Sequence, residues 1–128
     1  MIQINTPNLW KWYGYNADTN QKLEGLANCK KLKHLDLYDS PFINFLPFKK
    51  LKSLEFLEVQ ENKIESLIGL EHLPNLKKLY MFYNPIKEIS DITPIKNLQV
   101  IAIEKHKILK IIDDLNLLGI KYIVLGEG

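Results

Sequence analysis

Few side chains in this sequence belong to the types that carry out catalysis, and their spacing limits what they could do. Three histidines are scattered along the 128 residues, at His34, His72 and His106. No Cys/His cluster has the spacing of a metal site, so we expect neither a metal nor another cofactor. Asp36 and Glu58 would form a carboxylate pair if they lay on neighbouring strands. On an open, water-filled face such a pair would titrate near its ordinary range, which disfavours acid–base catalysis.

The elements that position these residues follow from an internal repeat of 22 residues. Three apolar columns stay in phase without insertion or deletion: Trp10, Leu32, Leu54, Leu76, Leu98 and Ile120; Tyr13, Leu35, Leu57, Leu79, Ile101 and Ile123; Tyr15, Leu37, Val59, Met81, Ile103 and Leu125. Further apolar columns keep the same phase, and one of them contains Cys29. A repeat of this length predicts stacked coils, each of which buries its apolar edge against its neighbours.

Within one unit the apolar period changes. Leu79 and Met81 alternate with polar or outward positions, as in a half-buried strand, whereas Ile86, Ile89 and Ile92 recur every third residue. A three-residue period is typical of 3₁₀ turns, and the segment is too short for a full α-helix. Each unit is therefore predicted to be a strand, a sharp turn and a 3₁₀-like return. An asparagine in the turn, such as Asn84, could hydrogen bond to the backbone of the next coil.

The pattern Leu54-x-x-Leu57-x-Val59-x-x-Asn62-x-Ile64 returns 22 residues later and resembles the leucine-rich-repeat family. The 22-residue unit resembles the short class of that family, which includes the bacterial internalins and the regulatory subunits of protein phosphatase 1. The resemblance implies an α/β right-handed solenoid of about six 22-residue units, with a parallel sheet on the concave face and 3₁₀-like returns on the convex face. We expect one domain, 1–128, with an N-terminal capping unit at 1–22, central repeats at 23–119 and a terminal strand at 120–128 whose edge is open.

Residues that alternate with the buried ones would point outward from the sheet and form a binding face. The expected partner-binding residues are Trp12, His34, Asp36, Tyr38, Asp39, Phe56, Glu58, Glu61, Lys78, Tyr80, Phe82, Tyr83, Glu104 and Tyr122. Aromatic side chains are typical of interface centres, and neighbouring carboxylates would be relieved by a basic partner surface. A merely solvated surface with single exposed aromatics is the alternative interpretation.

Composition limits the class of partner. A net charge of +2, from 17 basic and 15 acidic residues, comes without a polybasic block, so neither nucleic acid nor a membrane is the expected partner. A single cysteine excludes an intrachain disulfide, and the first residues lack the pattern of a secretory signal, so a cytoplasmic location is expected.

These features favour a non-catalytic protein–protein interaction module, monomeric or weakly oligomeric when free. An inhibitory or immunity protein of antitoxin type is one concrete form of this hypothesis. The alternative is a structural or regulatory assembly subunit that self-associates through its open C-terminal edge. A phosphatase regulator is a version of it that the family resemblance alone implies.

Overall fold

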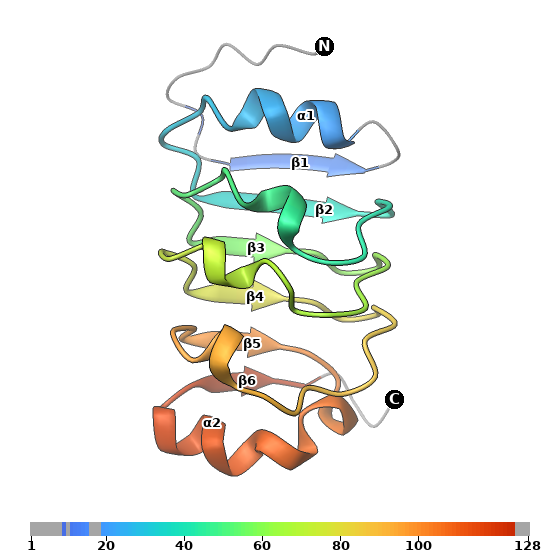
Figure 1. Cartoon of the computed structure of the whole chain (residues 1–128), viewed down its shortest axis with the longest axis vertical. Helices are drawn as coiled ribbons and strands as arrows, with labels where there is room; N and C mark the ends of the chain where they lie inside the picture. Colours follow the sequence, from blue (N-terminus) through green and yellow to red (C-terminus); the bar gives the residue numbers. More distant parts are fainter. Residues whose placement is uncertain (1–8, 10, 16–18, 125–128) are drawn as a thin grey trace.

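Six parallel strands, arranged in the order of the chain, form one sheet in the computed structural model, which describes residues 9, 11–15 and 19–124 (Figure 1). The strands are β1 (Lys11–Tyr15), β2 (His34–Tyr38), β3 (Phe56–Glu58), β4 (Lys78–Tyr80), β5 (Val100–Ala102) and β6 (Lys121–Ile123). This confirms the predicted stack of coils, each named below by its strand. The expected core residues Trp10 and Leu125 lie outside the described residues.

The connections between strands differ between the middle and the ends of the stack. Returns in the coils of β2, β3 and β4 contain 3₁₀ turns at Leu46–Phe48, Leu70–His72 and Thr93–Ile95, as predicted. The last connection contains two further 3₁₀ turns, at Lys105–Lys107 and Leu109–Ile111, followed by helix α2 (Ile112–Leu118). The first connection contains helix α1 (Thr19–Leu26), so the two helices are an addition to the predicted pattern of returns. Among the residues that the structure describes, no helix has the length and apolar character needed to span a bilayer.

Helix α2 has a clear local cause. Asp113 and Asp114 occupy its first turn, where carboxylates interact favourably with the helix dipole. Gly119 then adopts a left-handed conformation (φ 74°) and ends the helix, and the N–H of Ile120 donates to the carbonyl of Leu115. The side chain of Leu115 is fully buried. Helix α2 therefore covers the C-terminal end of the core, for which the repeat pattern alone offered no cap.

The core lies between the sheet and the return segments. Leu35, Leu57, Leu79 and Ile101 occupy equivalent positions on β2 to β5 and are 0% exposed. Because consecutive strands here are offset by 22 residues, equivalent side chains stack directly on one another. The 22-residue register is therefore confirmed for the four central strands.

The two outer strands leave this register by one residue. Lys11, rather than Trp12, is level with His34, and Lys121, rather than Tyr122, is level with Val100. A shift of one residue exchanges the two faces of a strand. The α-helical connections need not match the length of a 22-residue return, because a helix advances less per residue than an extended chain.

Trp12 and Tyr122 consequently pack against the core, so the prediction that they face outward was wrong. Tyr13 and Ile123, which were expected in the core, are instead 59% and 47% exposed. Gly14 makes this arrangement possible at the N-terminal end. A side chain at Gly14 would collide with the ring of Trp12, which fills that space.

The turns after β2, β3 and β4 share one backbone feature. Asp39, Glu61 and Tyr83, spaced 22 residues apart, all have positive φ values, between 53° and 62°. The side chain of Asn62 accepts the N–H of Ser40 at 2.8 Å and donates to the carbonyl of Leu37. One coil further on, Asn84 donates to the equivalent carbonyl, that of Val59, and accepts the N–H of Ile64. The predicted role of the turn asparagines is confirmed.

Candidate functional site

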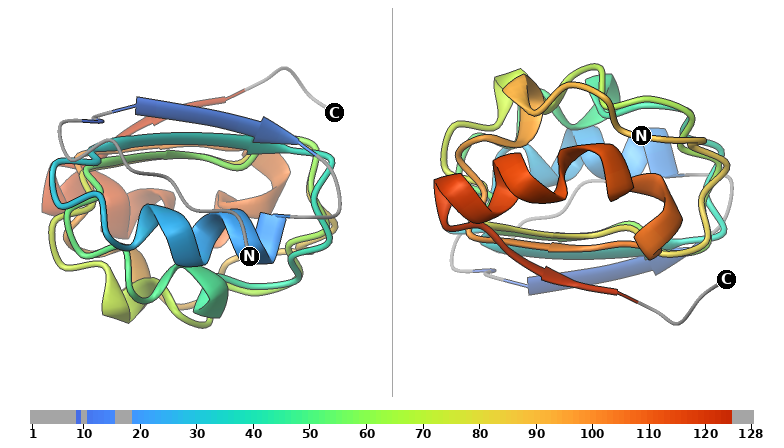
Figure 2. Two further views of the ribbon diagram at one scale, coloured as in Figure 1. Left: turned by 90° about the horizontal axis from the view of Figure 1, so that it is seen from above. Right: turned by 90° about the horizontal axis from the view of Figure 1, so that it is seen from below.

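The outer face of the sheet, which points away from the core, is concave. Seen along the stack, β1 and β6 lie farther from the helices than the central strands do (Figure 2). Residues of the central strands therefore form the floor of this face. We call His34, Asp36, Phe56, Glu58 and Tyr80 the central cluster, since they occupy the outward positions of β2, β3 and β4.

Aromatic rings of the central cluster pack on one another across the strands. The imidazole of His34 stacks on Phe56 with centroids 4.2 Å apart and planes inclined by 5°. Tyr80 packs against Phe56 in a T-shaped arrangement, with centroids 4.8 Å apart and planes inclined by 63°. The ammonium group of Lys78 lies 5.6 Å from the centre of the Phe56 ring, within cation–π range. The three rings thus form a continuous and laterally supported surface.

The acidic side chains of the central cluster lie side by side. Nε2 of His34 donates a hydrogen bond to Oε2 of Glu58 at 2.5 Å. Asp36 is directly opposite Glu58 on the neighbouring strand and forms no ion pair with any described residue. Burial raises the pKa of Asp36, and the charge of Glu58 raises it further, although His34 and Lys11 act in the opposite direction. The expectation of an ordinary titration for this pair was therefore wrong for Asp36, because its carboxyl group is half-buried.

Four of the predicted residues form a rim where the strands end. Tyr38 and Tyr83 are 46% and 58% exposed, and Asp39 and Glu61 are exposed as well. Asp39, Glu61 and Tyr83 are the turn residues with positive φ, so the backbone fixes the direction in which each side chain leaves the turn. This rim extends the central cluster toward the C-terminal ends of the strands.

Phe82 and Glu104 were predicted to be exposed on this face, and that prediction was wrong. Phe82 is 9% exposed and Glu104 is 6% exposed. Oε1 of Glu104 accepts the N–H of Tyr83 at 3.0 Å, where the turn before it uses a backbone carbonyl. The ammonium group of Lys107 donates to the same oxygen at 2.9 Å and to the carbonyl of Asn84 at 2.6 Å. This buried ion pair replaces the turn asparagine in the coil of β5, where the equivalent residue, His106, is exposed.

Sequence reasoning missed two outward residues at the N-terminal end of the face. Tyr13 and Lys11 stand beside Asp36 and His34, and the ammonium group of Lys11 lies 4.7 Å from the Tyr13 ring centre. The alternation within β1 contained a usable signal. The charge of Lys11 requires solvent, so strand alternation places Lys11 outward and Trp12 and Gly14 inward. Gly14 has no side chain and leaves room for the Trp12 ring, whereas the 22-residue spacing places Trp12 outward.

The chemistry available on this face is recognition of another surface. Within the part of the chain that the structure describes, no group of three His, Cys, Asp or Glu residues could hold a metal ion. Cys29 is buried at 3% exposure, as its core column predicted. A preorganised aromatic surface beside carboxylates can receive cationic and aromatic side chains of another protein.

Comparison with known proteins identifies the repeat in the middle of the chain. Residues 52–94 match the family described as leucine-rich repeats (two copies), and the matched segment runs from the coil of β3 into that of β4. This segment therefore consists of leucine-rich repeats, and the predicted resemblance to that family is confirmed. Proteins with this repeat commonly mediate protein–protein interactions. A search of the curated proteins found no match.

Two solved structures of internalins from Listeria monocytogenes are similar to this chain. Internalin C2 is 26% identical, with a TM-score of 0.51, over 62% of this chain and 35% of that one. The internalin inlF is 21% identical, with a TM-score of 0.57, over 80% of this chain and 30% of that one. The chain spans about a third of the length of either internalin, and the likeness to inlF concerns the fold alone.

Proposed function

We propose that this protein is a non-catalytic binding module that recognises one protein partner through the central cluster and its rim. The observation that carries the proposal is the environment of the Asp36 carboxyl group. Its carboxyl group is half-buried next to Glu58 and forms no ion pair among the described residues. A cationic side chain of a partner would stabilise both carboxylates at once, and perturbed carboxyl groups of this kind are typical of functional sites.

The aromatic rings of the central cluster would supply the apolar part of the interface. Phe56 is held between His34 and Tyr80, so its ring loses little conformational freedom when a partner covers it. Partly exposed aromatic residues surrounded by polar ones are typical of interface hot spots. Tyr38 and Tyr83 on the rim would close around such a contact and exclude water.

The finer form of the proposal is an inhibitory protein of the immunity or antitoxin type, acting in the cytoplasm by covering a basic surface of its target. A concave and preorganised face is suited to masking a convex surface, because few groups need to move on binding. The acidic residues of the central cluster and rim support a basic target.

The second candidate is an assembly subunit that associates with its own kind through the C-terminal end. The observation that favours it is the concentration of exposed apolar side chains there, including Leu117 at 85% and Ile123 at 47% exposure. A phosphatase-regulator role would be a further form of this candidate. Light scattering distinguishes the two candidates, because only self-association gives a mass that rises with protein concentration.

The test of the preferred function is affinity purification from the source cells followed by mass spectrometry. Asp36→Lys and Tyr80→Ala are expected to lose a protein that the wild type retains, by about tenfold or more, as for hot-spot residues. Glu24→Lys and Leu46→Ala are matched controls, since both residues are exposed and belong to the connections between strands, Glu24 to α1 and Leu46 to the return of β2. Retention of the same proteins by all four variants would contradict the proposal.

A further inference from the structure

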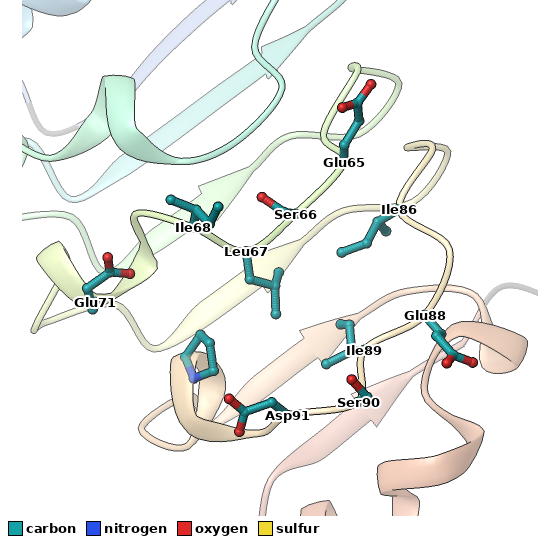
Figure 3. A pocket seen from close by; sticks show the side chains of 11 residues that line it. Glu65, Ser66, Leu67, Ile68, Glu71, Ile86, Glu88, Ile89, Ser90 and Asp91 are labelled. Atoms are coloured by element: carbon teal, nitrogen blue, oxygen red, sulfur yellow. The ribbon is translucent and has the colours of Figure 1, made fainter.

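Exposed aliphatic side chains are concentrated at the C-terminal end of the stack. Of the eight that the structure describes, five belong to the last coil: Leu109, Leu117, Leu118, Ile123 and Val124. The other three are distributed over the returns of the coils of β2 and β3. Ile68 is an example, at the side of a groove whose neighbouring Leu67 is buried (Figure 3). Scattered exposed residues are normal, whereas a concentration of them indicates an interaction surface.

The same end carries the open edge of the sheet. β6 is the last strand in the order, and the view from below shows no other described element over β6 or α2 (Figure 2). Toward β5, the N–H of Lys121 donates to the carbonyl of Gln99 at 2.9 Å. The carbonyl of Ile123 accepts the N–H of Ile103 at the same distance. Since successive residues direct their backbone groups to opposite edges, the N–H and the carbonyl of Tyr122 point away from β5. They are a template for another strand.

Helix α2 lies against β6 and is part of the same end. Its Leu115 is buried in the core, but Leu117 and Leu118 are 85% and 48% exposed. The last unit of a solenoid normally presents a polar outer face to solvent. The leucines of α2 depart from that rule. An occupant of this end therefore has to bring a strand for Tyr122 and an apolar surface for α2.

We propose that the occupant is a second copy of this chain, related by a twofold axis perpendicular to the sheet. The inference deepens the second candidate function, because it specifies how the copies would meet. The C-terminal end itself has a strand beside an apolar helix, so it is complementary to its own copy. Under this symmetry the two β6 strands run antiparallel, and each Tyr122 N–H donates to the carbonyl of the other Tyr122. The two outer faces stay on the same side, with both central clusters accessible.

The charges favour this register. With the axis at Tyr122, Lys121 of one copy lies opposite Ile123 of the other, and its aliphatic stem covers that side chain. A register with Lys121 opposite its own counterpart would place like charges together, which is destabilising. The helices α2 also run antiparallel, so Asp113 and Asp114 of one copy are far from those of the other. Such an interface uses the same patch on both copies and closes at a dimer.

The test is sedimentation velocity of the full chain from about 10 µM to about 1 mM, with amide hydrogen exchange at both concentrations. The mass should rise from 15.0 kDa to twice that value and no further, with a dissociation constant on the order of 100 µM for so small an interface. The Tyr122 amide should then exchange about fourfold more slowly at the higher concentration, in proportion to the fraction of monomer. Leu117→Lys, at a fully accessible position, should weaken association by about tenfold or more. Leu46→Lys, at a leucine 40% exposed on the return of β2, is the matched control and should leave it unchanged.

Each contrary result has a separate meaning. A protein that stays monomeric at about 1 mM would refute this proposal and the second candidate function, while capture of a partner by the monomer would still support the preferred one. A dimer that withstands Leu117→Lys, or that leaves the exchange of Tyr122 unchanged, would overturn this geometry and retain self-association. Masses above that of a dimer would exclude the twofold axis and indicate a head-to-tail contact. Equal weakening by Leu46→Lys would likewise contradict the proposal, because the added charge and not the C-terminal end would be the cause.

Discussion

The ion pair of Glu104 and Lys107 makes a sharp prediction about stability. Their side chains are 7% and 8% exposed, and Lys107 also satisfies the carbonyl of Asn84. In the variant Lys107→Met, Glu104 would keep only the hydrogen bond from Tyr83, and its Oε2 already has no partner among the described residues. Removing one member of a buried pair costs about 3–5 kcal/mol, because the remaining charge stays buried. The free energy of unfolding of a folded domain is only about 5–15 kcal/mol, so this variant should be close to unfolding.

Urea denaturation followed by circular dichroism measures this loss. With a slope of about 2 kcal/mol per molar urea, a loss of about 4 kcal/mol lowers the midpoint by about 2 M. The double variant Glu104→Gln/Lys107→Met removes both charges and keeps an acceptor for Tyr83. It should recover most of the loss, since a neutral pair of similar volume is often tolerated.

The same pair predicts a dependence on pH. Burial acts to raise the pKa of Glu104, but the hydrogen bonds from Lys107 and Tyr83 outweigh it, and the pKa lies below its usual value. A lowered acid pKa gives stability that is complete above the unfolded pKa and disappears as the pH falls through the folded one. Without Lys107 the burial remains and raises the pKa instead. The difference in the free energy of unfolding between wild type and Lys107→Met should therefore decrease from pH 7 to pH 4. A difference that does not change with pH would refute the reasoning, and so would a loss of less than about 1 kcal/mol at pH 7.

Three further predictions concern single residues. Asp36→Asn should stabilise the protein at pH 7 but not below about pH 3. The pKa of Asp36 is raised in the folded state, so its contribution to stability is present below the unfolded-state pKa and is lost as the pH rises through the folded-state pKa. Asn84→Ala should lower the free energy of unfolding by about 1–3 kcal/mol, since it leaves the N–H of Ile64 without its acceptor. Gly14→Ala should cost about 1–3 kcal/mol, because the new methyl group meets the ring of Trp12. All three are measured by urea denaturation.

Each of these variants has a control. Asp113→Asn changes an exposed carboxylate and should not reproduce the gain of Asp36→Asn; no gain in either variant would argue against repulsion on the outer face. Asn75→Ala removes an exposed hydrogen bond and should stay within about 0.5 kcal/mol of wild type. In a protein that already carries Trp12→Leu, Gly14→Ala should cost far less; an unchanged cost would mean that the two residues do not touch.

The sequence alone determined the stacked coils of the four central strands. Leu35, Leu57, Leu79 and Ile101 recur at a fixed interval, and a return of constant length can only place them on top of one another. The outward positions of these strands follow from the same alternation. For that reason the order of the residues is sufficient to identify the aromatic and acidic members of the central cluster.

Tertiary structure decided what lies at the two ends of the stack. The helical connections shift β1 and β6 by one residue, which turned Trp12 and Tyr122 inward and Tyr13 outward. The 22-residue interval predicts the other register for both strands, and the contacts of the end coils with α1 and α2 accompany the one that is adopted. Likewise, the burial of Glu104 depends on Lys107, which reaches it from the following turn. The 22-residue interval determines how the central coils stack. The contacts of each terminal coil determine the register in which β1 and β6 pair with their neighbouring strands.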